Sequence, residues 1–157
     1  MRTLFLLRHA KSSWDDPGIS DIDRPLNARG LNAAAFMGEY AARRGLIPDL
    51  IIASPARRTA QTADIFREHS GFNVPIHFDE RIYEASVGAL MNVIAGAAEN
   101  VESIMIVGHN PGIEGLIRHL TGKIEPMPTA ALAVIELEER SVAGKLKEVI
   151  RPKEAQK

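Results

Sequence analysis

The chain has 157 residues, the length of one ordinary globular domain, and its 45% apolar and 25% charged residues exclude a predominantly disordered protein. A formal net charge of −1 provides no overall basic field for nucleic acid, and 5% aromatic residues are too few for a base-stacking surface. The absence of cysteine excludes disulfides, thiolate metal sites, cysteine-ligated iron–sulfur clusters and a cysteine nucleophile.

The N-terminal segment does not resemble an export signal. Its apolar run, Leu4 to Leu7, is interrupted by Arg8 and His9, well before it reaches the ~7–15 residues of a signal-peptide core. No later segment approaches the ~20 apolar residues that cross a bilayer. We therefore expect a cytoplasmic protein without membrane or nucleic-acid partners.

Short apolar runs alternate with helical patterns along the whole chain. In chain order, the sequence predicts a strand at Thr3–Leu7, a helix at Asn32–Arg44, a strand at Asp49–Ala53, a helix at Arg58–His69, a short strand candidate at Val74–Phe78, a helix at Leu90–Ala98, a strand at Ser103–Val107, a helix at Ile113–Leu120, and strands at Ala133–Leu137 and Leu146–Ile150. Gly45 is placed to cap the first helix, and a turn near Ala143-Gly144 joins the last two strands.

This alternation favours one α/β domain with a largely parallel sheet. The sequence shows no internal repeat, linker or low-complexity tract, so we expect residues 1–157 to form a single domain. Residues 151–157 are polar and are predicted to form a frayed tail.

Polar motifs follow three of the predicted strands. The strands run into Arg8-His9-Ala10-Lys11-Ser12-Ser13-Trp14, Ser54-Pro55-Ala56-Arg57-Arg58 and Gly108-His109-Asn110-Pro111-Gly112. Because binding groups collect beyond the carboxyl ends of parallel strands, two histidines and two or three arginines are expected at one edge.

Arginine, histidine and a helix N-terminus together suit a phosphoryl group. Guanidinium groups match phosphate oxygens, backbone N–H groups after Gly112 add donors, and a neutral imidazole can attack phosphorus. Each motif alone also has a structural interpretation: Arg8-His9 as a polar junction, and the segment from Gly108 to Gly112 as a turn. Arg57-Arg58 is disfavoured beside the positive end of a helix, which supports a ligand-binding role for one of the two. The occurrence of all three motifs favours the phosphoryl hypothesis.

These motifs resemble the histidine phosphatase superfamily, which has the phosphoglycerate-mutase-like fold. Leu7-Arg8-His9-Ala10 is similar to the family's Arg-His-Gly signature, with alanine in place of glycine, and Ser54-Pro-x-x-Arg58-x-x-Gln61-Thr62-Ala63 and Gly108-His109-Asn110 follow in the family's order. The segments Arg8 to Trp14 and Asp23-Arg24-Pro25-Leu26 look most like the SixA-type phosphohistidine phosphatases of bacteria. The resemblance implies a three-layer α/β/α sandwich.

The resemblance also implies roles for individual residues. His9 matches the nucleophile, Arg8 and Arg58 match phosphate-binding arginines, and His109 matches the second histidine, which we expect to act as an imidazolium donor. Arg57 falls one position short of the motif and is expected to be structural or to lie on the rim.

Two further residues are site candidates. Ser12, near the nucleophile in sequence, is a candidate phosphate donor. Glu84 is the candidate general acid, with a solvated loop carboxylate as the alternative interpretation. A phosphoramidate depends less on a positioned acid than an alkyl phosphate does, because its leaving nitrogen is readily protonated.

The leading hypothesis is a metal-independent hydrolase, without a cofactor, that removes the phosphoryl group from phosphohistidine through a phospho-His9 intermediate. We expect its partner to be a phosphohistidine-bearing signalling or phosphotransfer protein, with phosphate or a related anion in the site. One alternative is a small-molecule phosphomonoesterase or mutase-like enzyme, which a functional Glu84 would favour. Another is a non-catalytic phosphoprotein-binding module. For the enzyme, we expect activity to fall at low pH as His9 gains a proton, with a bell-shaped profile if His109 must carry one.

Overall fold

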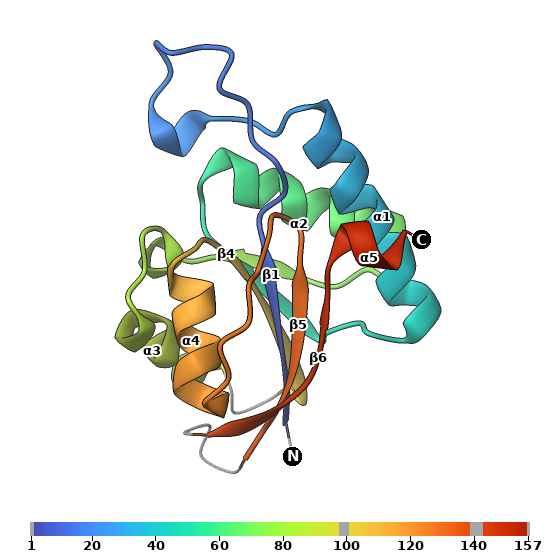
Figure 1. Ribbon diagram of the computed structural model, residues 1–157, viewed down its shortest axis with the longest axis vertical. Coiled ribbons are helices and arrows are strands. Elements are labelled where there is room, and N and C mark those ends of the chain that lie inside the picture. The colour runs from blue at the N-terminus through green and yellow to red at the C-terminus, as the bar shows by residue number, and fades with distance from the viewer. Residues whose placement is uncertain (1, 98–100, 139–142, 157) are drawn as a thin grey trace.

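The computed structural model describes residues 2–97, 101–138 and 143–156. Its centre is a six-stranded sheet with the order β3-β2-β4-β1-β5-β6 (Figure 1). The strands are β1 (Arg2–Arg8), β2 (Leu50–Ala53), β3 (Ile76–Phe78), β4 (Ser103–Gly108), β5 (Leu132–Leu137) and β6 (Gly144–Ile150). The first four are mutually parallel, whereas β5 pairs antiparallel with both β1 and β6. The predicted α/β class and largely parallel sheet are confirmed.

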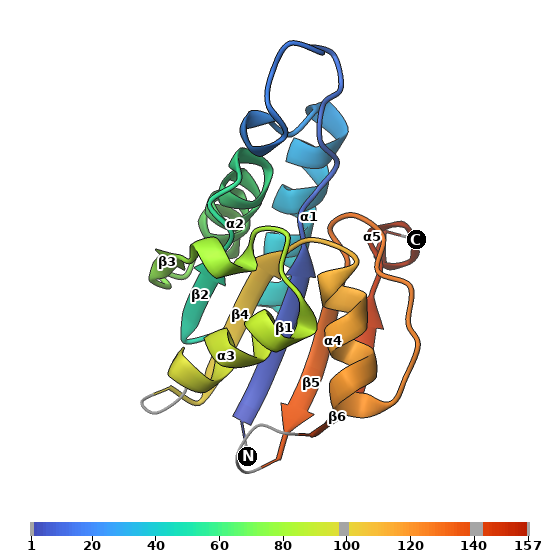
Figure 2. The ribbon, with the colours of Figure 1, turned by 90° about the vertical axis from the view of Figure 1, so that its left-hand side faces the viewer.

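Helices cover both faces of the sheet, which gives the expected three-layer α/β/α sandwich (Figure 2). On one face lie α1 (Ala28–Arg44), α2 (Arg57–Ser70) and the short α5 (Pro152–Ala155), and on the other lie α3 (Val87–Ala97) and α4 (Gly112–Thr121). Among the described residues, no helix is both long enough and apolar enough to span a membrane.

The strands β1 and β4 each contain a continuous apolar run, Leu4–Leu7 and Ile104–Val107, because each contributes to two cores. Leu4 and Leu6 face the core under α3 and α4, whereas Phe5 and Leu7 face the core under α1 and α2. All four side chains are at most 4% exposed. A strand buried on both faces reads as a continuous apolar run, which is why these two strands could be identified from the sequence.

The start of the first helix differs most from its predicted position, because a polar side chain caps the first turn. α1 begins at Ala28, before the predicted Asn32, because the Asn27 carboxamide oxygen accepts a hydrogen bond from the Gly30 N–H at 2.9 Å. Gly45 ends this helix with a φ of 69°, as predicted. The 3₁₀ helices η1 (Asp21–Asp23) and η2 (Glu80–Ile82) were not predicted, since so short a segment has no periodicity.

The prediction of a frayed tail at residues 151–157 is wrong for residues 151–156. Pro152 is buried at the first position of α5. The preceding Arg151 side chain donates to the Glu125 carboxylate at 2.9 Å and to the Pro126 carbonyl at 3.1 Å. These tertiary contacts hold the segment in place, although its polar composition is typical of a solvated tail. The turn was predicted near Ala143-Gly144, but Gly144 is already the first residue of β6, and residues 139–142 before it lie outside the described residues.

Close packing of α1 on α2 requires glycine at position 38. A Cβ atom there would lie 2.4 Å from the Phe66 carbonyl oxygen, whereas one at Gly96 in α3 would meet nothing within 4 Å. We expect Gly38→Ala to lower the free energy of unfolding by ~1–3 kcal/mol, because the two helices must move apart. The matched Gly96→Ala should raise it by up to about 1 kcal/mol, since alanine is the better helix former. Urea denaturation of both variants checks this, and equal effects would contradict it.

Candidate active site

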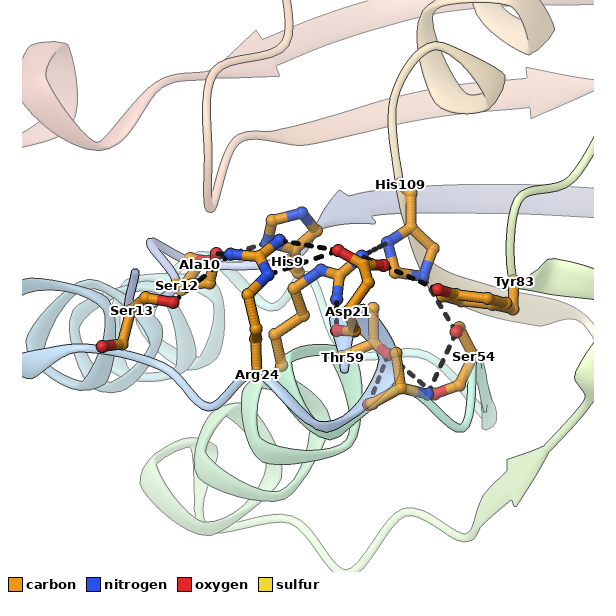
Figure 3. Close-up of polar contacts among 12 residues, drawn as sticks. His9, Ala10, Ser12, Ser13, Asp21, Arg24, Ser54, Thr59, Tyr83 and His109 are labelled. Carbon is orange, nitrogen blue, oxygen red and sulfur yellow. Dashed lines mark hydrogen bonds and ion pairs between the residues drawn. The ribbon is translucent and has the colours of Figure 1, made fainter. Parts of the chain in front are cut away.

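The three polar motifs meet at the carboxyl edge of the parallel strands (Figure 3). Backbone hydrogen bonds continue past the ends of the strands: the His9 N–H donates to the Gly108 carbonyl at 3.0 Å, and the Ser54 N–H donates to the Val107 carbonyl at 3.1 Å. The motifs that follow β1, β2 and β4 are therefore held side by side, as the sequence predicts.

His9 is held as the tautomer that a nucleophile needs. Its Nδ1 lies 2.7 Å from the Ala10 carbonyl oxygen, which can only accept, so Nδ1 carries the proton and donates. In the neutral ring the lone pair is then on Nε2. Burial lowers the pKa of His9 to about 4, and the positive charges of Arg58, Arg8 and Arg24 add to this effect against the opposing hydrogen bond to Ala10. The ring is thus neutral at pH 7.

His109 lies beside it, with the two ring centroids 5.4 Å apart. Its Nδ1 is 3.3 Å from a terminal nitrogen of Arg58, which can only donate, so Nδ1 accepts and the Nε2–H donates to Ser54 Oγ at 2.9 Å. Burial, followed by the charge of Arg58, lowers the pKa of His109 to about 3. His109 is therefore neutral at pH 7 and donates through its Nε2–H, so the expectation of an imidazolium is wrong and a bell-shaped profile that requires it is not expected.

The two predicted phosphate-binding arginines each keep one buried donor unpaired. Arg8 donates to the Met127 carbonyl at 3.0 Å, and Arg58 donates to the backbone carbonyl and the carboxylate of Asp21 at 2.8 and 3.1 Å. The Nε atoms of both arginines are buried and have no hydrogen-bond partner among the described residues. Buried unpaired donors are costly, and an anion would remove that cost.

Asp21 is the main residue that sequence reasoning missed. Its carboxylate accepts from the Tyr83 hydroxyl at 2.6 Å, and it pairs with Arg58 at 3.1 Å and Arg24 at 3.2 Å. The hydrogen bond from Tyr83 is the main reason why the pKa of Asp21 falls to about 2, and it also raises the pKa of Tyr83 to about 12. The chain has four aspartates between positions 15 and 23, and no local pattern distinguishes this one.

Arg24 joins this cluster to the rim of the site. Its guanidinium pairs with Asp21, not with Asp23 as the adjacent Asp-Arg dipeptide suggests, and it lies 3.6 Å from the centre of the Trp14 ring. Trp14 is 74% exposed, so it covers the arginine from the solvent side. Ser12 Oγ accepts a hydrogen bond from Arg24 at 2.6 Å. The predicted phosphate donor is therefore part of this cluster, but its oxygen is already paired with an arginine.

Glu84, the candidate general acid, lies at the edge of the site. It is exposed and has a φ of 53°, and its negative charge contributes to the raised pKa of the neighbouring Tyr83. The Tyr83 ring itself packs edge-on against His109, with the centroids 5.5 Å apart. Arg57 is exposed, as expected for the rim. Within the described ranges, His, Asp and Glu side chains form no cluster of three or more that could hold a metal ion.

Helix α2 supports the nucleophile segment through two polar side chains. Thr62 Oγ1 accepts from the Ala10 N–H at 3.0 Å, and Gln61 Oε1 accepts from the Leu26 N–H at 2.7 Å. Both residues belong to the motif that begins at Ser54, and nothing else in the sequence indicated this supporting role. They fix the backbone on either side of the loop that carries Asp21 and Arg24.

Comparisons with known proteins agree with this geometry. The family model described as histidine phosphatase superfamily (branch 1) matches residues 4–102. The chain belongs to the histidine phosphatase superfamily. It is 32% identical to an uncharacterised protein of Mycobacterium tuberculosis over 142 residues, which cover 83% of this chain and 87% of the relative. The superfamily membership and the structural neighbours identify the protein as a phosphatase, and hence a hydrolase.

Two solved structures share the whole fold. A crystal structure from Agrobacterium tumefaciens, assigned as the phosphohistidine phosphatase SixA, has 32% identity and a TM-score of 0.86, and the match covers 96% of this chain and 98% of that one. The protein histidine phosphatase SixA in complex with tungstate has a TM-score of 0.88 at 23% identity, over 98% of this chain and 99% of that one. The predicted phosphoglycerate-mutase-like architecture is confirmed.

Replacing the central carboxylate tests the cluster directly. We expect Asp21→Asn to lower the pKa of Tyr83 from about 12 towards the ordinary ~10, because the negative charge that disfavours the tyrosinate is lost. Tyrosinate absorbance in a Tyr40→Phe background, recorded up to pH ~11 with the fold followed by circular dichroism, measures this. Asp23→Asn is the matched control, because the Asp23 carboxylate accepts from Ser20 and not from Tyr83. Equal shifts in both variants would contradict the assignment.

Proposed function

We propose that this phosphatase hydrolyses phosphohistidine on a protein through a covalent phospho-His9 intermediate. The observation that carries the proposal is a neutral His9, with its Nδ1–H fixed on Ala10, beside two arginines whose buried Nε donors lack partners. A nucleophile with a free lone pair and unpaired cationic donors are the two groups that phosphoryl transfer requires.

In the first step, the lone pair on His9 Nε2 attacks phosphorus. The bond between phosphorus and the substrate nitrogen breaks and its electron pair stays on that nitrogen, while the substrate ring takes up one proton from solvent and leaves as a neutral imidazole. In the second step, water attacks phospho-His9, which releases inorganic phosphate and returns the neutral ring. Arg8 and Arg58 bind the phosphoryl oxygens in both steps, and His109 and Ser12 lie within the same cluster to complete the binding site.

Two observations support phosphohistidine as the substrate class. The 32% identity to the SixA structure extends over almost the whole of both chains. In addition, Glu84 is exposed, and a leaving imidazole nitrogen depends less on a positioned acid than an alkoxide does. The position of Glu84 next to Tyr83 supports the second candidate, a small-molecule phosphomonoesterase, in which this carboxyl group protonates the leaving oxygen.

The lowered pKa of His9 predicts the pH dependence of the reaction. Because the free ring gains a proton only near pH 4, kcat/KM for the substrate should stay level through pH ~6.5, where an ordinary histidine is half protonated, and fall only as the pH approaches 4. Titration of the His9 imidazole by NMR, with His9→Gln to assign its signals, measures the pKa of His9 directly, and we expect a midpoint near pH 4. A midpoint close to the ordinary value would contradict the assigned environment.

Turnover by His9→Ala tests the mechanism and the substrate together. We expect the variant to lose at least ~10³-fold activity on a phosphohistidine-bearing protein, because the group that accepts the phosphoryl is gone. His119→Ala, an exposed histidine on α4, is the matched control and should retain activity. Turnover that survives in His9→Ala would contradict the mechanism.

The same assay on a panel of phosphomonoesters separates the two candidate functions. Glu84→Gln should leave phosphohistidine turnover nearly unchanged, whereas a loss of ~10²-fold or more on an alkyl phosphate would be expected if Glu84 is a general acid. A wild-type preference for alkyl phosphates that depends on Glu84 would replace the proposed substrate class with the second candidate.

A further inference from the structure

A basic groove of about 590 Å³ lies beside the candidate active site. It is bounded by the first turns of α1, the segment before β5 and the short helix α5, which packs against α1 (Figure 1). We use the name basic groove for the following residues: Lys11, Arg29, Asn32, Ala33, Pro128, Thr129, Arg151, Pro152, Lys153, Glu154 and Gln156.

The charge of the groove is strongly positive compared with that of the whole chain. Four of its residues are cationic and only Glu154 is anionic, in a protein with a formal net charge of −1. The charge of Arg151 is met by Glu125 at 2.9 Å and Glu154 at 3.8 Å. By contrast, three exposed cations form no ion pair with a described residue: Lys11, Arg29 and Lys153.

The backbone adds to this positive potential. The N-terminal end of α1 carries the positive end of the helix dipole, and its first turn contains Arg29 but no acidic residue. Helices normally place carboxylates at this end, so a cation here is unfavourable unless an anion compensates it. The groove therefore has a surplus of positive charge that the described protein does not neutralise.

Two of the groove's residues are neighbours of the nucleophile segment. Lys11 follows His9 by two residues, so their Cα atoms are at most about 7 Å apart. Thr129 precedes Ala130, whose N–H donates to the carbonyls of Arg8 and His9 at 3.2 and 3.1 Å. A polypeptide that presents a side chain to His9 can thus place residues a few positions away over Lys11 and the start of α1.

The geometry points to the basic groove as the docking site for an acidic segment that flanks the phosphohistidine of the substrate protein. This inference rests on the proposed function, because it assigns the surface beside that same site. Carboxylates of the substrate pair with Arg29, Lys153 and Lys11, while the phosphohistidine reaches His9. Exposed pairs of this kind are individually weak, so they act mainly on KM and on the rate of encounter, and salt screens them.

The test uses peptides that each carry one phosphohistidine. In two peptides a run of glutamates precedes or follows the phosphohistidine, in a third glutamines replace the glutamates, and free phosphohistidine is the small substrate. At low salt we expect the wild-type kcat/KM to favour one acidic peptide over the glutamine peptide by about tenfold, with the preference lost at high salt.

Arg29→Glu/Lys153→Glu reverses two of the unpaired charges without touching the residues assigned to catalysis. We expect this variant to lose the preference for the acidic peptide while turnover of free phosphohistidine stays unchanged. Lys123→Glu/Lys145→Glu is the matched control: it makes the same change in net charge after the end of α4 and at the start of β6, away from the carboxyl edge of the sheet. The control should keep the preference.

Each outcome decides between the hypotheses. A wild-type enzyme that hydrolyses all peptides equally, or equal losses in the variant and its control, would overturn the docking site and leave the proposed function intact. A wild-type enzyme that hydrolyses neither the peptides nor free phosphohistidine would overturn the proposed function, and the docking site with it.

Discussion

The parallel pairing of β1 with β4 is the constraint on which the site depends. In this register Arg8 lies opposite Gly108, so the residues that follow, His9 and His109, leave the sheet side by side. The adjacent pairing of β4 with β2 ends at Ala53 opposite Val107, which adds Ser54 and the start of α2 to the same edge. A shift of one residue in either pairing would turn these side chains to the other face of the sheet.

Concentrating positive charge at this edge has a cost that Asp21 offsets. Arg24 and Arg58 are each less than a tenth exposed, and both pair with the Asp21 carboxylate. Burial is the main reason why the pKa of His9 is low, and the charges of Arg58, Arg8 and Arg24 add to it. The arginines proposed to bind a phosphoryl anion therefore also help to keep the proposed nucleophile unprotonated.

Helix α2 links this electrostatic arrangement to the core. Its first turn supplies Arg58, its next turn holds the backbone at Ala10 and Leu26 through Thr62 and Gln61, and its far end packs on α1 at Gly38. Because the same helix carries Arg58 and holds the backbone next to His9, the distance between these two residues is set by packing rather than by a flexible loop. The basic groove begins on the other side of the nucleophile segment, at the first turn of α1.

The sequence by itself determined the α/β architecture and the meeting of His9, His109, Arg8 and the Arg57-Arg58 pair at one edge of the sheet. Strands buried on both faces are continuous apolar runs, and polar motifs at the ends of neighbouring parallel strands lie together, so local pattern was sufficient for both conclusions. The choice of Arg58 over Arg57 came from the resemblance to the histidine phosphatase superfamily. Only the tertiary structure revealed the protonation states of the two histidines, because both depend on burial and on the charge of Arg58, which comes from a segment distant from His9 and His109 in the sequence. The role of Asp21 was also decided by the tertiary structure, because its partners Tyr83 and Arg58 are far away in the sequence. The same holds for the ordered conformation of residues 151–156, which depends on the contacts of Arg151 with Glu125 and Pro126.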